Sequence, residues 1–568
     1  MQKRFGLLKK RKNIMNDIQK LYAEWTEKVT DPEVAAQLQA LAKDENALKN
    51  AFFKNISFGT GGLRGELGAG TNCLNVYTVR KVTQGIADCM KAHGYQTAAI
   101  SYDSRINSEV FARAAASVFA ANGLTAYITK ELMPTPFLSY ITRSLKADVG
   151  VMITASHNPA KYNGYKVYGA DGCQLTDAGA LEMTDYIEAV DIFSVQSETF
   201  DSYVAQGAIR FVDDALIEGF LSEVYALHRG NAEGLSITYT PLNGTGYKLV
   251  PAILQRMGAQ NVQIVAEQAY PDGNFTTCPY PNPEKAEALK LGLAYAEKAN
   301  SDLLLATDPD CDRVGIAVKT ADGYKLMTGN EVGALLADYL LSARKADGSL
   351  PQAPVLVKTI VTTELVRKIA AEYNAEVWDV LTGFKYIGEI IGKLEKTGET
   401  ERFVLGFEES YGYLSGSYVR DKDGVNGCMM IVEMAAYYKK QGKTLVDRMN
   451  ELYEKYGLFE HKLLSYEFAG AQGNAEMQTR LQNFRANMPT TFGGETVVKT
   501  VDYLTQTEMD LPKSNVLSLF MQDGSQVVVR PSGTEPLIKV YLTVTKNKTE
   551  NEKKLALLCG EVGALFGV

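Results

Sequence analysis

The stretch ADVGVMITASHNP, residues 147–159, begins as an apolar run and ends in a polar turn. Its Val, Ile and Met residues are typical of a strand that is buried on both faces, and Pro159 ends the pattern. The predicted strand ends near Ser156, which is followed by His157. Because ligands of open α/β sheets bind beyond the carboxyl ends of the strands, this turn is a candidate functional loop.

Five other segments have the same organisation, in which an apolar run ends in a polar cluster and a helical stretch follows. They are TAAISYDSR (97–105), LSITYTPLNGTG (235–246), SDLLLATDPDCDR (301–313), PVLVKTIVTTE (354–364) and RFVLGFEES (402–410). Strands that alternate with helices predict mainly parallel sheets covered by helices on both faces. The motif falls into three blocks, so we expect three similar α/β units with parallel or mixed sheets.

The two ends of the chain differ from this pattern. Residues 1–50 predict amphipathic helices, and residues 514–545 predict two strands around Asp523-Gly524, a loop and a third strand, followed by a closing helix. This pattern therefore predicts a smaller α+β domain at the C-terminal end. The expected division is an N-terminal helical extension packed on domain 1 (1–50), domain 1 (51–206), domain 2 (207–325), domain 3 (326–455) and domain 4 (456–568).

Composition narrows the class of protein. A chain of 568 residues is too long for one hydrophobic core, and a net charge of −8 argues against non-specific nucleic-acid binding. Seven cysteines without a CxxC pair are typical of a reduced cytoplasm. The basic N-terminus has no apolar run behind it, and no apolar stretch is long enough to span a membrane. We expect a cytoplasmic protein with no nucleic-acid or membrane partner.

The segment DPDCDR, residues 308–313, places three carboxylates at alternate positions after a strand. Such oxygen ligands suit a hard cation, Mg²⁺ or Ca²⁺. An EF-hand loop requires Gly at its sixth position, where this chain has Arg313. Three carboxylates that leave positions open for water or phosphate favour Mg²⁺; the alternative is a solvated acidic turn.

Two polar clusters offer sites for other groups. In RPSGTEP, residues 530–536, two hydroxyls and a compact backbone can converge on an anion, and Arg530 adds a bidentate fork for phosphate. Glu408-Glu409-Ser410 follows a strand and can bind sugar hydroxyls. Taken singly, the first cluster is better explained by an ordinary Pro/Gly turn and the second by two solvated charges.

Several weaker features remain. FGTGGLRG, residues 58–65, lacks the spacing of a dinucleotide fingerprint, and its glycines indicate close approach of the backbone to a ligand, with Arg64 pointing in. Lys385, Arg420 and Arg105 lie in predicted loops, where a cation is more often a surface charge than a ligand. The run Pro134-Thr135-Pro136 predicts only a stiff turn.

A serine hydrolase is the first alternative for Ser156. That chemistry requires a GxSxG elbow, which the chain lacks. In an extended segment, moreover, Ser156 and His157 would point in opposite directions, so the histidine is not simply a base for the serine. Phosphoryl transfer fits better, because the chain also offers a Mg²⁺ site and anion-binding clusters.

Four motifs in order, TASHNP, DPDCDR, GFEES and RPSGTEP, resemble those of the α-D-phosphohexomutases. The resemblance runs from about residue 50 to the end of the chain. The segments GTGGLRG and GFEESYGY most resemble the phosphoglucomutase/phosphopentomutase branch. It implies three similar α/β domains and a C-terminal α+β domain around a central cleft. Cys311 stands where the family often has Gly or Ala, between the metal ligands.

The resemblance also implies a set of roles. Ser156 would carry a phosphate, and one Mg²⁺ would bind a phosphoserine oxygen together with Asp308, Asp310 and Asp312. The general base remains open among His157, Lys385 and Arg64, of which Arg is the poorest because it does not deprotonate. The implied substrate-binding residues are Arg313, Thr382, Gly383, Glu408, Ser410, Arg420, Arg530, Ser532, Gly533 and Thr534.

The implied activity is interconversion of hexose 1-phosphate and hexose 6-phosphate through a phosphoserine and a bisphosphorylated sugar, with glucose 1,6-bisphosphate as intermediate and activator. The sugar is open: glucose is the first choice, and mannose or pentose phosphates are alternatives. A catalytically silent sugar-phosphate-binding regulator on the same fold is a further alternative. We expect small-molecule sugar phosphates as partners and a monomer or homodimer.

Overall fold

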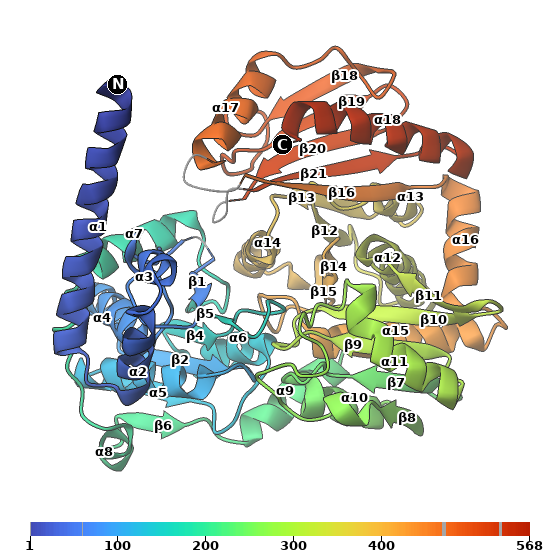
Figure 1. Cartoon of the computed structure of the whole chain (residues 1–568). Helices are drawn as coiled ribbons and strands as arrows, with labels where there is room; N and C mark the ends of the chain where they lie inside the picture. Colours follow the sequence, from blue (N-terminus) through green and yellow to red (C-terminus); the bar gives the residue numbers. More distant parts are fainter. Residues whose placement is uncertain (1, 60, 469–472, 533–536, 568) are drawn as a thin grey trace. The chain divides into compact units, whose positions relative to one another are not determined.

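The computed structural model describes residues 2–59, 61–468, 473–532 and 537–567. Figure 1 labels its helices and strands. The chain divides into two compact units. Unit 1 consists of Met1–Ala317 and Gly416–Val432, and unit 2 consists of Val318–Ser415 and Glu433–Val568.

Three of the four sheets repeat one strand order. In unit 1, the first sheet contains the adjacent strands β5-β4-β2-β3, which are β2 (Thr97–Tyr102), β3 (Thr125–Ile128), β4 (Val149–Ile153) and β5 (Tyr162–Gly169). The second contains β10-β9-β7-β8, which are β7 (Ser236–Thr240), β8 (Asn261–Ile264), β9 (Leu303–Thr307) and β10 (Val314–Thr320). In unit 2, the third sheet is β15-β14-β12-β13, made of β12 (Val355–Thr359), β13 (Glu376–Val380), β14 (Phe403–Glu408) and β15 (Gly412–Leu414).

Each of these sheets therefore has its strands in the order fourth, third, first, second along the chain. The first three strands of the first and third sheets run parallel, and the fourth is antiparallel to the third. The antiparallel pairing follows from the connection, because the eight residues between β4 and β5 are too few for the crossover that a parallel strand needs. The prediction of three similar α/β units with mixed sheets is confirmed.

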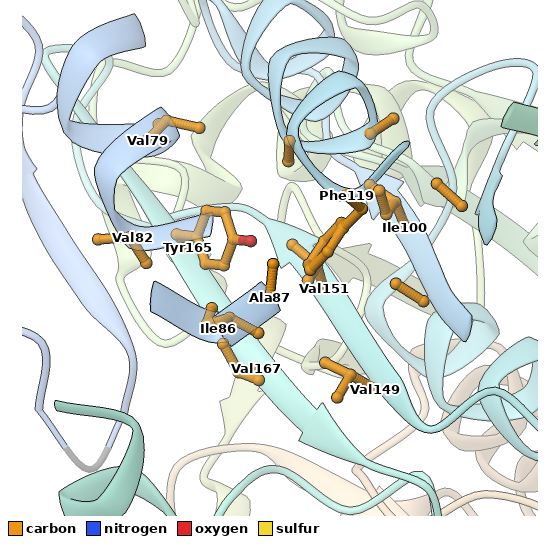
Figure 2. Close-up of a cluster of buried hydrophobic side chains, with 14 of the residues drawn as sticks. Val79, Val82, Ile86, Ala87, Ile100, Phe119, Val149, Val151, Tyr165 and Val167 are labelled. Atoms are coloured by element: carbon orange, nitrogen blue, oxygen red, sulfur yellow. The ribbon is translucent and has the colours of Figure 1, made fainter. Parts of the chain in front are cut away.

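Helices of unit 1 cover the first sheet. Figure 2 shows Val79, Val82 and Ile86 of α4 (Val76–Ala92) close to Tyr165 and Val167 of β5. All of these side chains belong to one buried apolar cluster, which also includes residues of α5 (Ser108–Ala121) and α7 (Asp177–Ala189). The first sheet extends past residue 206, since β6 (Ile209–Phe211) pairs with β3, and β1 (Leu63–Glu66) pairs with β5 at the other edge.

The other helices around the three α/β sheets, and the strand β11, follow the predicted alternation of strands and helices. They are α6 (Thr135–Ser144), α8 (Phe200–Ala205), α9 (Ala215–Tyr225), α10 (Gly246–Arg256), α11 (Ala286–Ala299), β11 (Gly323–Met327), α12 (Gly329–Ala346), α13 (Leu365–Ala371), α14 (Phe384–Thr397), α15 (Gly424–Lys439) and α16 (Leu445–Tyr456). The chain leaves unit 1 within β10, returns to it at residue 416, and leaves it again within α15.

The N-terminal segment is helical, as predicted. It forms α1 (Gln2–Lys28), α2 (Pro32–Leu41) and α3 (Glu45–Phe52). Trp25 is almost fully buried, and its ring makes edge contacts with the rings of Phe52 and Tyr77. These helices therefore pack on the start of α4, which carries Tyr77.

The C-terminal part of unit 2 is the predicted α+β domain. Its sheet, β16-β21-β20-β19-β18-β17, is antiparallel throughout and consists of β16 (Glu460–Glu467), β17 (Thr491–Phe492), β18 (Glu495–Asp502), β19 (Leu517–Met521), β20 (Gln526–Pro531) and β21 (Leu537–Val544). Gly524 has φ +85° at the predicted turn between β19 and β20. The helices α17 (Gly473–Ala486) and α18 (Lys548–Phe566) share one apolar cluster with this sheet.

None of the helices in the described part of the chain has the combination of length and apolarity that crossing a bilayer requires.

Candidate functional site

The polar clusters occupy the same topological position in all three α/β sheets. Ser156, Asp308 and Glu408 each lie at or just beyond the carboxyl end of the third strand, where the chain turns back into the antiparallel fourth strand. Each turn contains a non-glycine residue in the left-handed region: Ser156 (φ 51°), Cys311 (φ 51°) and Tyr411 (φ 69°). Such backbone is sparsely populated and concentrates at functional sites.

Ser156 meets the loop of the second sheet. Its Oγ donates a hydrogen bond to Oδ2 of Asp308 over 2.6 Å, and its backbone N–H donates to Oγ1 of Thr154 over 2.8 Å. Its Oγ also lies 3.2 Å from Nδ1 of His157. The prediction that Ser156 and His157 point in opposite directions was wrong, because the left-handed backbone at Ser156 breaks the alternation of an extended segment.

Asp308, Asp310 and Asp312 form a buried carboxylate group. Each is at most 1% exposed, and one oxygen from each lies within 4.8 Å of the others. The backbone N–H groups of Asp312 and Arg313 donate to Oδ1 of Asp308 over 3.1 and 3.0 Å, which fixes the turn. The alternative of a solvated acidic turn is excluded by this burial.

Three neighbouring side chains that sequence reasoning did not assign to this group complete it. Nζ of Lys166 lies 3.0 Å from Oδ2 of Asp310, and Nζ of Lys422 lies 2.8 Å from Oδ2 of Asp312. Oγ1 of Thr135 donates to Oδ2 of Asp310 over 2.9 Å. The expectation that the Pro134-Thr135-Pro136 run is only a stiff turn was therefore wrong, because Thr135 begins α6 and orients a carboxylate.

Electrostatics in the group favour a cation. Burial and the charges of Asp310 and Asp312 raise the pKa of Asp308 well above its ordinary value, and burial and Asp310 also raise the pKa of Asp312. Burial acts in the same direction on Asp310, but the ammonium groups of Lys166 and Lys422, together with hydrogen bonding, outweigh it and lower the pKa of that carboxyl. Oδ1 of Asp310 and Oδ1 of Asp312 are buried with no hydrogen-bond donor among the described residues. An all-oxygen set with unsatisfied acceptors fits Mg²⁺.

Close backbone contacts hold the carboxylate loop. A Cβ at Gly244 would stand 2.4 Å from Cα of Pro309, so only glycine permits this approach. The N–H of Thr245 then donates to the carbonyl of Pro309 over 2.8 Å. Sγ of Cys311 is directed toward Gly246, where an added Cβ would meet it at 2.9 Å.

Arg105 holds the serine loop. The expectation of a surface charge was wrong: Arg105 is 3% exposed, with its Nε 3.3 Å from Oδ2 of Asp103. Its guanidinium donates to the carbonyl oxygens of Ser156, Asn158, Pro159 and Tyr162. A buried guanidinium with several carbonyl acceptors fixes the turn that presents Ser156.

His157 is surrounded by positive charge. Burial lowers the pKa of His157 well below its ordinary value, and the guanidinium groups of Arg313 and Arg64 add to the effect. The imidazole is therefore neutral near pH 7 and able to accept a proton. Arg313 donates to Glu284, and Arg64 lies exposed on β1.

Arg420 is fully buried within unit 1. Its Nη1 donates to the carbonyl of Val419 over 3.1 Å and to that of Ser417, and its backbone N–H donates to Oγ of Ser139 over 3.0 Å. The guanidinium therefore stabilises the conformation of the segment that carries Lys422.

In unit 2, Glu408 joins two loops. Its Oε1 accepts a hydrogen bond from the N–H of Gly383 over 3.0 Å. Gly383 precedes α14, and Lys385 lies in the first turn of that helix. Oγ1 of Thr382 is buried with no hydrogen-bond partner in the described part of the chain. The structure thus brings the predicted residues Thr382, Gly383 and Glu408 together at a helix N-terminus.

The neighbouring Glu409 is held by β12 and the turn after it. Its Oε2 accepts hydrogen bonds from Oγ1 of Thr359 over 3.3 Å and of Thr362 over 3.2 Å. Ser410 follows, partly exposed, in the turn before β15.

Arg530 is the penultimate residue of β20 in unit 2. The charges of Glu409, Arg530 and Glu408 all act on Tyr541 of β21, whose pKa is raised chiefly by burial. Tyr541, which sequence reasoning missed, therefore lies near both the acidic turn and the hairpin. The N–H of Ser532 donates to the carbonyl of Leu537 over 2.7 Å and closes the base of that hairpin. The predicted residues Gly533 and Thr534 lie outside the described residues.

Fold and site together define a multidomain α/β protein with a buried carboxylate triad, suited to a divalent cation, beside a serine. Comparison with known proteins agrees with this class. Three models of the phosphoglucomutase/phosphomannomutase family match, namely α/β/α domain I at residues 55–192, domain II at 216–323 and domain III at 328–456.

Curated relatives match over most of their length. Phosphoglucomutases of Staphylococcus aureus and Staphylococcus saprophyticus are 36% and 35% identical to the chain, and each match covers 92% of it and 95% or 96% of the relative. The chain belongs to the phosphoglucomutase/phosphomannomutase family, within the α-D-phosphohexomutase superfamily.

Solved structures share the fold. The phosphoglucomutase parafusin of Paramecium aligns with a TM-score of 0.68 at 16% identity and covers 90% of this chain and 94% of its own. A phosphoglucomutase/phosphomannomutase family protein of Burkholderia thailandensis aligns with a TM-score of 0.67 at 18% identity and covers 89% of this chain and 97% of its own.

Proposed function

We propose that this protein is a phosphoglucomutase, which interconverts hexose 1-phosphate and hexose 6-phosphate by way of a phosphoserine at Ser156. The observation that carries the proposal is the 2.6 Å hydrogen bond from Oγ of Ser156 to Asp308 of the carboxylate triad. It puts a potential phosphoryl carrier directly beside oxygen ligands for a hard divalent cation. Membership of the family and the names of the curated relatives support the same activity.

In the first half-reaction, the P–O bond to Ser156 breaks as a free hydroxyl of the sugar monophosphate forms a new P–O bond. The hydroxyl proton passes to a base, Oγ of Ser156 takes up a proton as it leaves, and the product is a sugar bisphosphate. In the second half-reaction, Oγ of Ser156 gives up its proton and forms a P–O bond to the other phosphoryl group. The bond from that phosphorus to the sugar oxygen breaks, and the sugar oxygen takes up a proton, which yields the isomeric monophosphate. Mg²⁺, held by Asp308, Asp310, Asp312 and a phosphoserine oxygen, would neutralise charge that develops on the transferring oxygens.

The residues around Ser156 have separate roles in this scheme. Arg105 and the left-handed backbone hold the serine loop, while Lys166 and Thr135 orient Asp310. We propose His157 as the group that exchanges a proton with Oγ of Ser156, because its Nδ1 lies 3.2 Å from that atom. The base for the sugar hydroxyl stays open among His157, Lys385 and Arg64. Arg64 is the poorest of the three because a guanidinium does not deprotonate.

Residues of unit 2 recognise the rest of the substrate in this proposal. Glu408 and Ser410, with Thr382 and Gly383, bind sugar hydroxyls, and the buried, unsatisfied hydroxyl of Thr382 supports this role. The group that holds the non-reacting phosphate is Arg530, Ser532, Gly533 and Thr534. Arg313 and Arg420 are also proposed as substrate ligands, although Arg420 is buried against its own loop.

Glucose phosphates are the proposed substrates, with glucose 1,6-bisphosphate as activator and intermediate, and one Mg²⁺ per chain. The names of the curated relatives support glucose over mannose or pentose. We further propose a cytoplasmic monomer or homodimer. The seven cysteines, all among the described residues, form no disulfide with one another, as a reducing compartment allows.

The test is a substrate panel with the purified full-length protein, Mg²⁺ and glucose 1,6-bisphosphate. Glucose, mannose, glucosamine and ribose 1-phosphates are compared by kcat/KM. The proposal expects glucose 1-phosphate to be the best substrate. Turnover of another sugar at a higher kcat/KM would reassign the substrate, and binding without turnover of any of them would indicate a silent regulator.

A further inference from the structure

A second group of metal-ligand side chains lies in unit 1, apart from the aspartate triad. Ligand atoms of Cys89, His93 and Glu182 are all within 4.8 Å of one another. Nε2 of His93 is 2.7 Å from Oε1 of Glu182. Cys89 and His93 lie in the last turn of α4 and at its C-cap, and Glu182 lies on α7.

Helix packing creates this group. Gly85, Cys89 and His93 are spaced four residues apart and therefore lie on one face of α4. A Cβ at Gly85 would stand 2.5 Å from Cα of Ile187, so the glycine lets α7 come unusually close. Because Ile187 faces Gly85 while Glu182 faces His93, the two helices run antiparallel.

We propose that Cys89, His93 and Glu182 form a Zn²⁺ site that links the C-terminal end of α4 to α7. A thiolate, an imidazole and a carboxylate are the ligands of borderline divalent transition ions, and Zn²⁺ binds all three types. Mg²⁺ prefers oxygen ligands alone, so this site and the aspartate triad select different ions. The inference does not depend on the proposed mutase activity.

The surroundings suit a cation with one open position. The side chains of His93 and Glu182 are 43% and 50% exposed, so water can supply a fourth ligand, while Cys89 is 3% exposed. The ring of Tyr95 stacks on that of His93 at 5.4 Å and limits its orientation. The C-terminal end of α4 carries partial negative charge, which favours a cation.

Binding of a metal by Cys89 releases the thiol proton, because only the thiolate is a ligand. The expected signature is one proton released per ion bound, together with a new metal–thiolate bond.

Co²⁺ is the spectroscopic probe for this bond. Full-length protein is stripped with chelator, kept reduced, saturated with Mg²⁺ and titrated with Co²⁺. A thiolate-to-cobalt charge-transfer band should saturate at one equivalent and disappear when Zn²⁺ is added. Ser156→Ala should keep the band, which separates this site from failure of the proposed function.

Variants assign the ligands. His93→Ala and Glu182→Gln change half-exposed side chains and should weaken Zn²⁺ binding by about 10- to 100-fold or more. Cys89→Ser should abolish the band, whereas Cys73→Ser, which changes a partly exposed cysteine of the same unit, should leave it unchanged. Zn²⁺ should raise the unfolding temperature of the wild type more than that of His93→Ala. Absence of the band in the wild type, or an equal band in Cys89→Ser, would overturn the proposal.

Discussion

Oγ of Ser156 lies 2.6 Å from Oδ2 of Asp308, although 152 residues separate them in the chain. Both residues follow the third strand of a sheet with the same strand order. The serine and the carboxylate triad are thus placed by one topological position used twice within unit 1. In unit 2, Glu408 occupies that position for the third time.

Thr135→Val should weaken Mg²⁺ activation by about 10- to 100-fold, because it removes the hydrogen bond that orients Asp310 while keeping the side-chain volume. The measurement is the Mg²⁺ concentration that gives half-maximal activity. Thr142→Val is the matched control, since this buried threonine of α6 donates only to the carbonyl of Leu138 among the described residues. Equal Mg²⁺ dependence in both variants would remove Thr135 from the metal group.

Chelation should abolish activity reversibly. Stripping the protein with a chelator leaves three buried carboxylates, and the ammonium groups that pair with them among the described residues are those of Lys166 and Lys422. Added Mg²⁺ should restore turnover of the wild type but not of Asp312→Asn. Full activity after exhaustive chelation would argue against a role for the triad in catalysis.

Glu408→Gln should lower kcat/KM for glucose 1-phosphate by about 10- to 100-fold, as expected for loss of a charge-assisted hydrogen bond. The amide oxygen can still accept from Gly383, so the loop should keep its conformation. Glu401→Gln, at an exposed position in the same unit, serves as control and should retain normal kinetics. A variant at 408 with unchanged kcat/KM would contradict sugar recognition by this residue.

Acid should destabilise unit 2 through His461. Burial lowers the pKa of His461 to about 4, and the ammonium of Lys358 adds to the effect. The unfolded chain takes up a proton as the pH falls below about 6.5 while the folded chain does not until about 4, so protons favour unfolding in this window.

The resulting loss at pH 5, relative to pH 7, is roughly 2 kcal/mol of unfolding free energy. His461→Gln should lose less stability than the wild type over this range, because glutamine does not titrate. Denaturant unfolding of both proteins at the two pH values measures the difference. An identical loss in the variant would show that other groups cause the acid sensitivity.

Much of this architecture is readable from the sequence. Apolar runs that end in polar clusters predicted β2, β4, β7, β9, β12 and β14, because buried strands and the turns after them have distinct local compositions. The carboxylates of the triad were predicted for the same reason, since their alternate spacing is a local feature. The division at residues 206, 325 and 455 stays a prediction.

Contacts between segments that are distant in the chain could not be predicted from the sequence. Lys166 lies on β5 and Thr135 begins α6, and neither position differs locally from an ordinary strand lysine or helix threonine. Tyr541 was missed for the same reason. Arg105 was taken for a surface charge because its carbonyl acceptors lie more than fifty residues away in the sequence. The contact of His157 with Ser156 depends on a left-handed backbone, which sequence does not indicate at a serine.

The central claim is that Ser156 carries the transferred phosphoryl group. Intact-mass analysis and peptide mapping after incubation with glucose 1,6-bisphosphate and Mg²⁺ test it directly. The account predicts one added phosphate, located on Ser156, that is lost to glucose 1-phosphate and absent in a folded Ser156→Ala variant with turnover lower by orders of magnitude. A protein that turns over glucose 1-phosphate while Ser156 stays unmodified, or while another residue carries the phosphate, would contradict it.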